Sequence, residues 1–318
     1  MVNLMVTSLA AAITKLASKQ TFYTIRFLVD RPLVDDAYRA YAYFRWIDDV
    51  VDEVSSSGWD AGDTERLIRL RFLDRQKALL EACLSGEEPC DVDPHEAMLV
   101  DLVRHADRSD PRLEAYLHHM MLVMEFDVGR RGRLVTQEEL DDYTRSLAVA
   151  VAEAMHYFIG NGAAAPHDET RYLAVSGAHI VHMLRDSYSD VRAGYFNVPR
   201  EVLEASSIGP ADVRCDAYRA WVRERVALAR AYFEAGQSYF AHVQSRRHRL
   251  AGIAYMARFE WLIEALERNG FTLQAEYAEQ RSLSTGLRMG RYVVSSLARP
   301  RWIRRLVVPV AAIRADRS

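Results

Sequence analysis

The chain has 318 residues, of which half are hydrophobic and 27% are charged, a composition typical of globular proteins. A net charge of −3 gives no overall basic field of the kind that nucleic-acid-binding proteins carry, so we expect no nucleic-acid partner. Only 15 Gly and 9 Pro occur, which favours long helices over short strands joined by tight turns.

Helical periodicity runs through most of the chain. In the N-terminal segment, residues 1–19, no basic residue precedes the apolar part, and polar residues interrupt that part. The segment therefore predicts an amphipathic helix rather than a signal peptide. No uninterrupted apolar run of about 18 residues occurs, which predicts that no helix spans a membrane. The periodicity predicts helices over residues 3–17, 33–54, 61–84, 94–107, 111–130, 136–160, 169–190, 211–243, 248–268 and 272–297.

The predicted helices are joined by short loops, and no linker-like composition divides the chain. We therefore expect one all-α domain over residues 1–318. Cys83, Cys90 and Cys215 are widely spaced and have no paired metal-ligand spacing, which favours a reduced, cytoplasmic protein.

A basic tail begins at about residue 288. From Arg288 to Ser318 there are eight Arg and a single acid, Asp316. Such a tail, interleaved with apolar residues, is compatible with peripheral contact with the anionic inner face of a membrane. A terminal helix packed on the body of the protein, with solvated arginines, would show the same pattern, and both interpretations stay open.

A first acidic cluster lies on the predicted helix over residues 33–54, which is apolar on most of its faces. Asp48 and Asp52 are four residues apart, so their carboxylates share one face, and Tyr41 and Arg45 continue that stripe. Buried like charges are costly without a compensating cation, and Mg²⁺ binds one or two carboxylates together with substrate phosphates. A solvated acidic patch at a helix end is the alternative.

A second acidic cluster lies on the predicted helix over residues 169–190. His179, His182, Asp186 and Asp190 form one polar stripe on an otherwise apolar helix. Asp186 and Asp190 repeat the spacing of the first pair, and two such pairs are stronger evidence than one. The histidines are ambiguous, because each of them is also typical of a satisfied core residue.

Together the two pairs predict a site that clamps Mg²⁺ ions, which in turn hold a diphosphate. Arg45 and Arg185 lie within one helical turn of these aspartates, and arginine binds phosphate oxygens bidentately. Their alternative role is to pair with the same aspartates in a structural ion network.

The motifs that carry these residues resemble those of the squalene/phytoene synthase family. RAYAYFRWIDDVVDE and MLRDSYSDVRAGYFNVPRE resemble its two aspartate-rich motifs, and KQTFY at residues 19–23 resembles its N-terminal signature. Two further segments, residues 124–155 and 261–272, resemble its central and late helices. The resemblance covers residues 18–275 in the order that the family has.

The resemblance implies a single-domain, all-α isoprenoid-synthase fold, a helical bundle around a central cavity. It also implies Mg²⁺-dependent ionisation of an allylic prenyl diphosphate. By position, the implied metal ligands are Asp48, Asp52, Asp186 and Asp190, and the implied catalytic residues that contact the diphosphate are Tyr41, Arg45 and Arg185. Further implied diphosphate-binding positions are Lys19, Gln20, His182 and Tyr195.

Some of these positions depart from the family pattern. The signature lysine falls on Gln20, with Lys19 one residue earlier, and an arginine that binds phosphate is replaced at Tyr195. His182 stands where the family has an amide, and Phe259 where it has a tyrosine. One ionisation centre therefore looks complete, whereas the second has lost positive charge.

Three functions follow from this pattern. The first is head-to-head prenyl transfer from farnesyl or geranylgeranyl diphosphate, as in squalene and phytoene synthases. The second is a class I terpene cyclase or an atypical prenyltransferase on the same fold, which the departures favour. The third is a non-catalytic relative that acts as an assembly factor, against which the four aspartates argue. No dinucleotide-binding fingerprint occurs, but the use of NADPH as a reductant stays open, because family members that reduce their product lack one as well.

Overall fold

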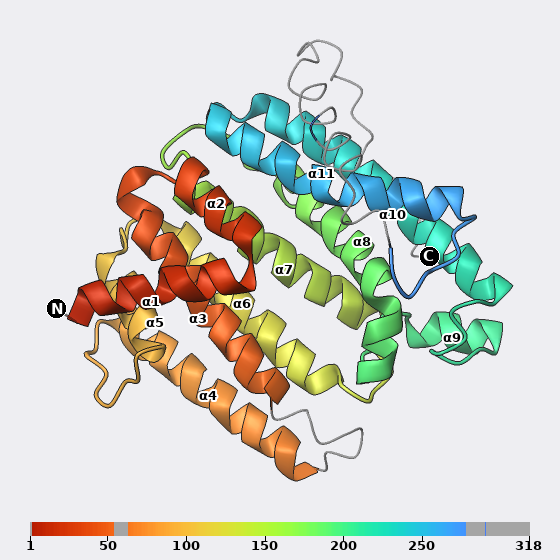
Figure 1. Cartoon of the computed structure of the whole chain (residues 1–318), viewed down its shortest axis with the longest axis horizontal. Coiled ribbons are helices and arrows are strands. Elements are labelled where there is room, and N and C mark those ends of the chain that lie inside the picture. The colour runs from red at the N-terminus through yellow and green to blue at the C-terminus, as the bar shows by residue number, and fades with distance from the viewer. Residues whose placement is uncertain (1, 54–62, 278–289, 291–318) are drawn as a thin grey trace. The chain divides into compact units, whose positions relative to one another are not determined.

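The computed structural model describes residues 2–53, 63–277 and 290. Within these residues all regular secondary structure is helical, which confirms the all-α prediction. The elements are α1 (Val2–Ala17), α2 (Lys19–Leu28), a 3-10 turn η1 (Arg31–Leu33), α3 (Val34–Glu53), α4 (Asp63–Ser85), α5 (Glu96–His105), α6 (Pro111–Arg130), α7 (Gln137–Phe158), α8 (Thr170–Ala193), α9 (Arg200–Ser206), α10 (Asp216–His242) and α11 (Arg246–Arg268) (Figure 1).

Two helices, α2 and α9, were not predicted from the sequence. α2 follows α1 after a single residue, Ser18, whose extended backbone and side-chain oxygen, which accepts from the Thr21 backbone N–H, cap the new helix. Periodicity cannot show a break of one residue. The predicted helix from residue 272 is wrong at its start, since 272–277 are not helical, and the rest of it lies outside the described residues apart from Gly290.

The described chain separates into two compact units. Unit 1 comprises residues up to Gly162 together with Arg192–Phe196, and unit 2 comprises Ala163–Val191 and the residues from Asn197 onward. This separation does not test whether the chain folds as one domain, which stays a prediction.

In unit 1, α3 is held by its buried face. Tyr43 is fully buried and donates its hydroxyl hydrogen to Oε1 of Gln76 on α4 at 3.0 Å. Gln76 in turn donates to Oε1 of Glu96 on α5 at 2.9 Å, and Arg75 forms a bidentate pair with the same carboxylate. The network fixes the rotation of α3, so its opposite face, which carries Tyr41, is directed away from α4 and α5.

In unit 2, α8 packs closely on α10. A Cβ on Gly177 of α8 would lie 3.0 Å from the Phe233 ring and 3.1 Å from the Ala229 carbonyl oxygen. A Cβ on Gly236 of α10 would lie 2.7 Å from that of Ala174. The small residues on α8 and α10 therefore serve the close approach of the two helices.

None of the helices in the described part of the chain combines the length and the apolarity that crossing a bilayer requires. The basic tail from about residue 288 lies outside the described residues, apart from Gly290, so its predicted membrane contact is not tested.

Candidate active site

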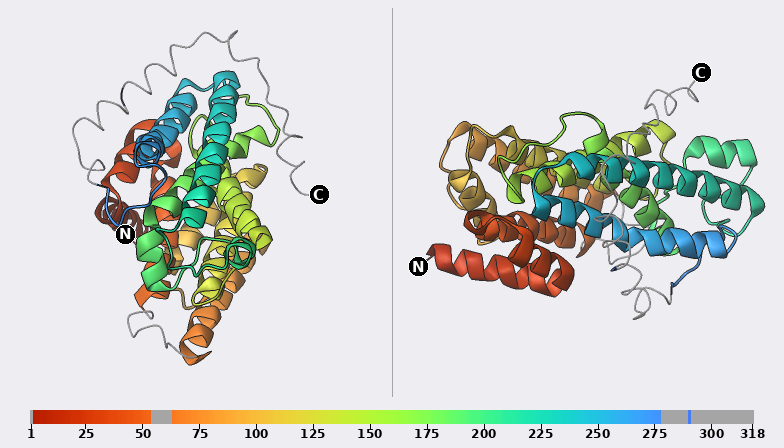
Figure 2. Two further views of the ribbon diagram at one scale, coloured as in Figure 1. Left: turned by 90° about the vertical axis from the view of Figure 1, so that its right-hand side faces the viewer. Right: turned by 90° about the horizontal axis from the view of Figure 1, so that it is seen from above.

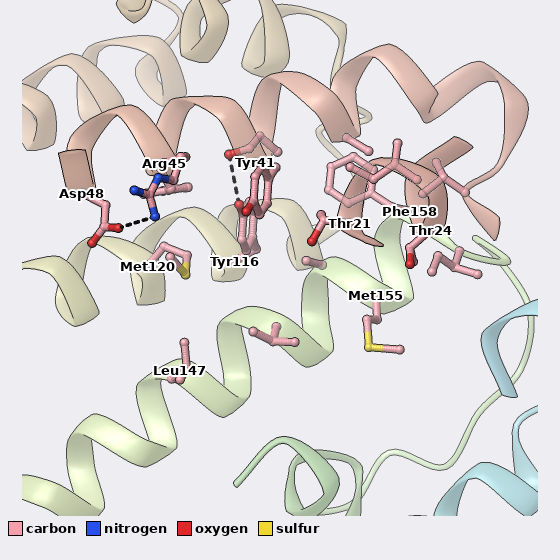
Figure 3. A pocket seen from close by; sticks show the side chains of 18 of the residues that line it. Thr21, Thr24, Tyr41, Arg45, Asp48, Tyr116, Met120, Leu147, Met155 and Phe158 are labelled. Carbon is pink, nitrogen blue, oxygen red and sulfur yellow. Dashed lines mark hydrogen bonds and ion pairs between the residues drawn. The ribbon is translucent and has the colours of Figure 1, made fainter. Parts of the chain in front are cut away.

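An apolar pocket of about 430 Å³ lies in unit 1 beside the first aspartate motif. It is bounded by α2, α3, α6 and α7, and Tyr41, Arg45 and Asp48 of α3 all line it. Figure 3 shows Asp48 and Leu147 at one end of the pocket and Phe158 and Thr24 toward the other. Three of the four residues in the stripe predicted from helical spacing thus line one wall of the pocket, which is polar at one end only, and Asp52 is not among the lining residues.

At the polar end, Arg45 is paired with acids of its own helix. Its Nη1 lies 3.2 Å from Oδ2 of Asp48, and its Nη2 donates to Oδ1 of Asp49. A structural ion network would show the same pairs, so the role of Arg45 in diphosphate binding stays a prediction. Its side chain is 40% exposed, which leaves it accessible to a ligand in the pocket.

A third carboxylate, Asp127 of α6, acts electrostatically on the two aspartates of the first motif. Desolvation and the neighbouring charge of Asp52 raise the pKa of Asp48 to about 6, and Asp127 contributes in the same direction. The pKa of Asp52 is also raised, by desolvation and then by Asp127. The sequence assigned no role to Asp127, although its place between Phe126 and Val128 was a usable signal.

Asp127 is itself fixed by two donors. Arg130 donates from Nε to Oδ1 at 2.8 Å, and Tyr143 of α7 donates from its hydroxyl to Oδ2 at 3.0 Å. Each bond uses a different carboxylate oxygen, so the group is held in one orientation. Lone pairs remain on both oxygens for a further partner.

Tyr195 covers the arginines at the end of α6. Its ring centroid lies 5.0 Å from Cζ of Arg130 and 5.9 Å from Cζ of Arg131. Gly132 donates its backbone N–H to the Gly194 carbonyl, and Arg131 donates to the Ala193 carbonyl, which holds this segment on α6. Desolvation raises the pKa of Tyr195, and the negative charge of Asp52 raises it further. Tyr195, a predicted diphosphate-binding position, therefore lies near the first aspartate motif.

The second aspartate motif lies on α8 in unit 2. Asp186 accepts two hydrogen bonds from Arg185, both at 2.7 Å, and lies 2.9 Å from Nε2 of His182. Desolvation alone would raise the pKa of Asp186, but these partners hold it below its ordinary value. Asp190 accepts a hydrogen bond of 2.6 Å from the amide of Asn197, a buried residue for which the sequence predicted no role.

His182 and His179 have different surroundings. His182 is half-exposed, and its ring lies 6.2 Å from that of Phe259 on α11, which is also in contact with Tyr255. His179 is buried within α8. Of the two histidines in the predicted stripe, His182 is therefore accessible to a ligand, whereas His179 is a core residue.

Lys19 and Gln20 lie in the first turn of α2. Both are exposed, and neither is among the residues that line the pocket, whereas their neighbour Thr21 is. Their predicted contact with a diphosphate is not tested.

Within the described residues, no three His, Cys, Asp or Glu side chains converge closely enough to bind a metal ion by themselves. Mg²⁺ does not require three, because it commonly takes one or two carboxylates and completes its shell with water and phosphate oxygens. The donors in each motif are carboxylate oxygens, the type that this cation prefers. The residues present therefore fit the predicted ion.

Comparison with known proteins finds similarity in both sequence and fold. The sequence pattern of the family described as squalene/phytoene synthase matches residues 15–288. The structure is similar to that of squalene synthase HpnC from Alicyclobacillus acidocaldarius, with a TM-score of 0.64 and 20% identity, over 85% of this chain and 95% of that one. It is also similar to a dehydrosqualene synthase in complex with ligand, with a TM-score of 0.68 and 15% identity, over 93% of this chain and 97% of that one.

No curated protein matches the chain. At identities of 15–20%, the two structural similarities show a common fold and do not show a common substrate. The family pattern covers most of the chain and includes both aspartate motifs. The chain therefore belongs to the squalene/phytoene synthase family.

Proposed function

We propose that this chain is a Mg²⁺-dependent prenyltransferase that ionises an allylic diphosphate, farnesyl or geranylgeranyl, and joins prenyl groups head to head. The observation that carries the proposal is the pocket of unit 1. Arg45 and Asp48 stand at one end of a hollow that is otherwise lined almost wholly by apolar and aromatic side chains. A molecule with a charged head and a long apolar chain is the ligand that such a pocket fits.

The polar end supplies groups for the diphosphate. Asp48, Asp52, Asp186 and Asp190 would hold Mg²⁺, which would supply positive charge to offset that of the departing diphosphate. Arg45 can turn from its carboxylate partners to the phosphate oxygens, since it is half-exposed and its planar fork binds phosphate bidentately. Arg185 of the second motif has the same donors and the same kind of carboxylate partner.

The apolar end excludes water from the carbocation that remains when diphosphate leaves. Aromatic rings of Tyr41, Phe44, Tyr116 and Phe158 line the pocket, and their faces attract positive charge. The Tyr116 hydroxyl is turned away from any reaction with the cation, because it donates to the Ala40 carbonyl at 3.2 Å. The pocket thus surrounds the cation with aromatic side chains, while this buried oxygen is occupied.

The test is to replace one aspartate in each motif. Asp48→Asn and Asp186→Asn should each lower kcat by about a hundredfold or more at saturating Mg²⁺, because each removes a charge that binds the metal. Asp74→Asn, at an exposed position on α4, is the matched control and should retain full activity. Circular dichroism checks that all three variants are folded. Wild-type turnover in either motif variant would refute the metal assignment.

A terpene cyclase or a prenyltransferase with another acceptor is the second candidate. It is favoured by Tyr195, whose ring covers Arg130 and Arg131 where the family pattern has a cation for a second diphosphate. Mass spectrometry of products from farnesyl and geranylgeranyl diphosphate, singly and paired, separates the candidates. A product of doubled carbon number supports head-to-head transfer, and a cyclic product of unchanged carbon number supports cyclisation.

A further inference from the structure

The first two helices expose several large apolar side chains. Leu16 at the end of α1 is 88% exposed, Phe27 of α2 is 70% exposed and Tyr23 is 51% exposed. Tyr23 and Phe27 are one helical turn apart, and their rings are stacked with centroids 6.1 Å apart. An exposed aromatic pair of this kind is unusual on a surface that meets only water.

The same segment is basic. Residues 1–29 contain no acid at all, whereas Lys15, Lys19 and Arg26 are all exposed. Lys15 extends over the ring of Phe22, with Nζ 5.5 Å from its centroid, so cationic and aromatic groups are interleaved. Apolar side chains among cations, in a segment of 29 residues that contains no acid, are the composition of segments that lie on anionic lipid headgroups.

We propose that this face of α1 and α2 docks the protein on the surface of a membrane that contains anionic lipid. The face is defined by its exposed apolar and cationic residues, which are Lys15, Leu16, Lys19, Tyr23, Arg26 and Phe27. Figure 2 shows α1 and α2 side by side, and the two helices are in contact.

A second copy of this chain fits the face less well. In a two-fold dimer the same patch meets itself, so the cations of one copy would face those of the other. Lipid headgroups supply the negative charge that this face lacks, and their acyl boundary accepts Leu16 and Phe27.

Docking on this face places the pocket near the lipid. Thr21, Thr24 and Ile25 on the other side of α2 line the pocket, so a single helix, about 10 Å across, separates its interior from the exposed aromatic pair. An isoprenoid product is itself soluble in lipid, and this relation would shorten its path out of the protein. That last step rests on the proposed function, whereas docking does not.

The experiment measures docking of the full chain without substrate. Sedimentation with vesicles compares phosphatidylcholine alone with phosphatidylcholine that contains about one third phosphatidylglycerol. The wild type should bind the anionic vesicles at low salt and should be released from them at about 1 M salt. The combined Leu16→Ser, Tyr23→Ser and Phe27→Ser variant should bind at least about tenfold more weakly.

Two further variants separate charge from apolar contact. Lys15→Ser with Arg26→Ser should weaken binding to anionic vesicles by about fivefold for each cation removed. Leu67→Ser with Ile68→Ser, which removes exposed apolar side chains from α4, is the matched control and should bind like the wild type.

Unchanged binding of the Leu16, Tyr23 and Phe27 variant would overturn the proposal and would assign any vesicle binding to another part of the chain. Equal binding to neutral and anionic vesicles would also overturn it. So would a concentration-dependent dimer in vesicle-free buffer that this variant abolishes. Because no substrate is present, each outcome is independent of whether the proposed reaction is correct.

Discussion

The length of the pocket predicts which prenyl chain the enzyme prefers. On α3 the lining runs from Ala37 to Asp48, and on α7 from Leu147 to Phe158, which is about 16 Å of helix in each case at 1.5 Å per residue. A farnesyl chain of three isoprene units measures about 15 Å when extended, at about 5 Å per unit, and a geranylgeranyl chain measures about 20 Å. We therefore expect the wild type to prefer the C15 donor.

The far end of the pocket is closed by side chains that can be shortened. Phe158 and Val29 line it there, and the Asp30 backbone N–H donates to the Phe158 carbonyl at 2.9 Å, which ties the end of α2 to the end of α7. Replacing Phe158 by Ala removes a ring whose reach is roughly that of one isoprene unit. Complete burial of five additional carbons is worth about 4 kcal/mol at about 0.8 kcal/mol per carbon.

Even a third of that value changes specificity by about tenfold. We expect Phe158→Ala to raise the ratio of kcat/KM for the C20 donor over the C15 donor by at least about tenfold. The assay is competition between the two donors, with products separated by mass spectrometry. Since Phe158 is buried, the Ala variant loses about 3–5 kcal/mol of stability, and Phe158→Leu should shift the ratio less at a smaller loss.

Leu147→Ala is the control, because it removes apolar bulk at the Asp48 end of the same pocket. It should leave the C20 to C15 ratio near that of the wild type. The reasoning is refuted if folded Phe158→Ala keeps the wild-type ratio, or if Leu147→Ala shifts the ratio as far.

Three further predictions concern other parts of the fold. Asp127→Asn should raise the Mg²⁺ concentration needed for half-maximal activity by about tenfold in protein that circular dichroism shows to be folded, and an unchanged Mg²⁺ requirement would exclude Asp127 from the site. Hydrogen bonds from Arg75, which outweigh the effect of desolvation, lower the pKa of Glu96 from 4.5 to about 2. The stabilisation that results is complete above about pH 4.5 and is lost as the pH falls toward 2. The urea midpoint of Glu96→Gln should therefore fall less steeply than that of the wild type over this range. Gly252→Ala should lower the free energy of unfolding by about 1–3 kcal/mol, because the added Cβ would overlap the buried Phe240 ring, and Phe240→Leu in the same chain should restore most of it.

Most of the fold was readable from periodicity because the helices are long and have few breakers. α6 begins and ends at the predicted residues, with Asp110 as its N-cap and Pro111 in its first turn. α7 begins within a residue of its prediction, at a capping box formed by Thr136 and Glu139. α2 was missed because Ser18 alone separates it from α1.

Less of the site was readable, since its geometry depends on contacts between distant segments. Spacing within one helix placed Tyr41, Arg45 and Asp48 on a common face, and all three line the pocket. Asp127 lies on another helix, and its bond with Tyr143 spans two elements, which no local pattern indicates. Family resemblance placed Tyr195 at a diphosphate-binding position, and the sequence could not show that its ring packs on two arginines.

The apolar character of α3 has two separate causes, which sequence cannot tell apart. Tyr43 and Ile47 are apolar or aromatic because they are packed fully inside unit 1. Ala37 and Phe44 are apolar because they line a hollow of about 430 Å³. Hydrophobic periodicity counts both groups as core, so the pattern predicts a buried helix and gives no measure of cavity depth. On α2 the reverse holds, because Tyr23 and Phe27 are apolar in character and yet exposed. The hollow beside α3 and the exposed rings on α2 thus adjoin one pocket. A long apolar ligand that enters from lipid or leaves to lipid would explain why a single region of the molecule carries both features.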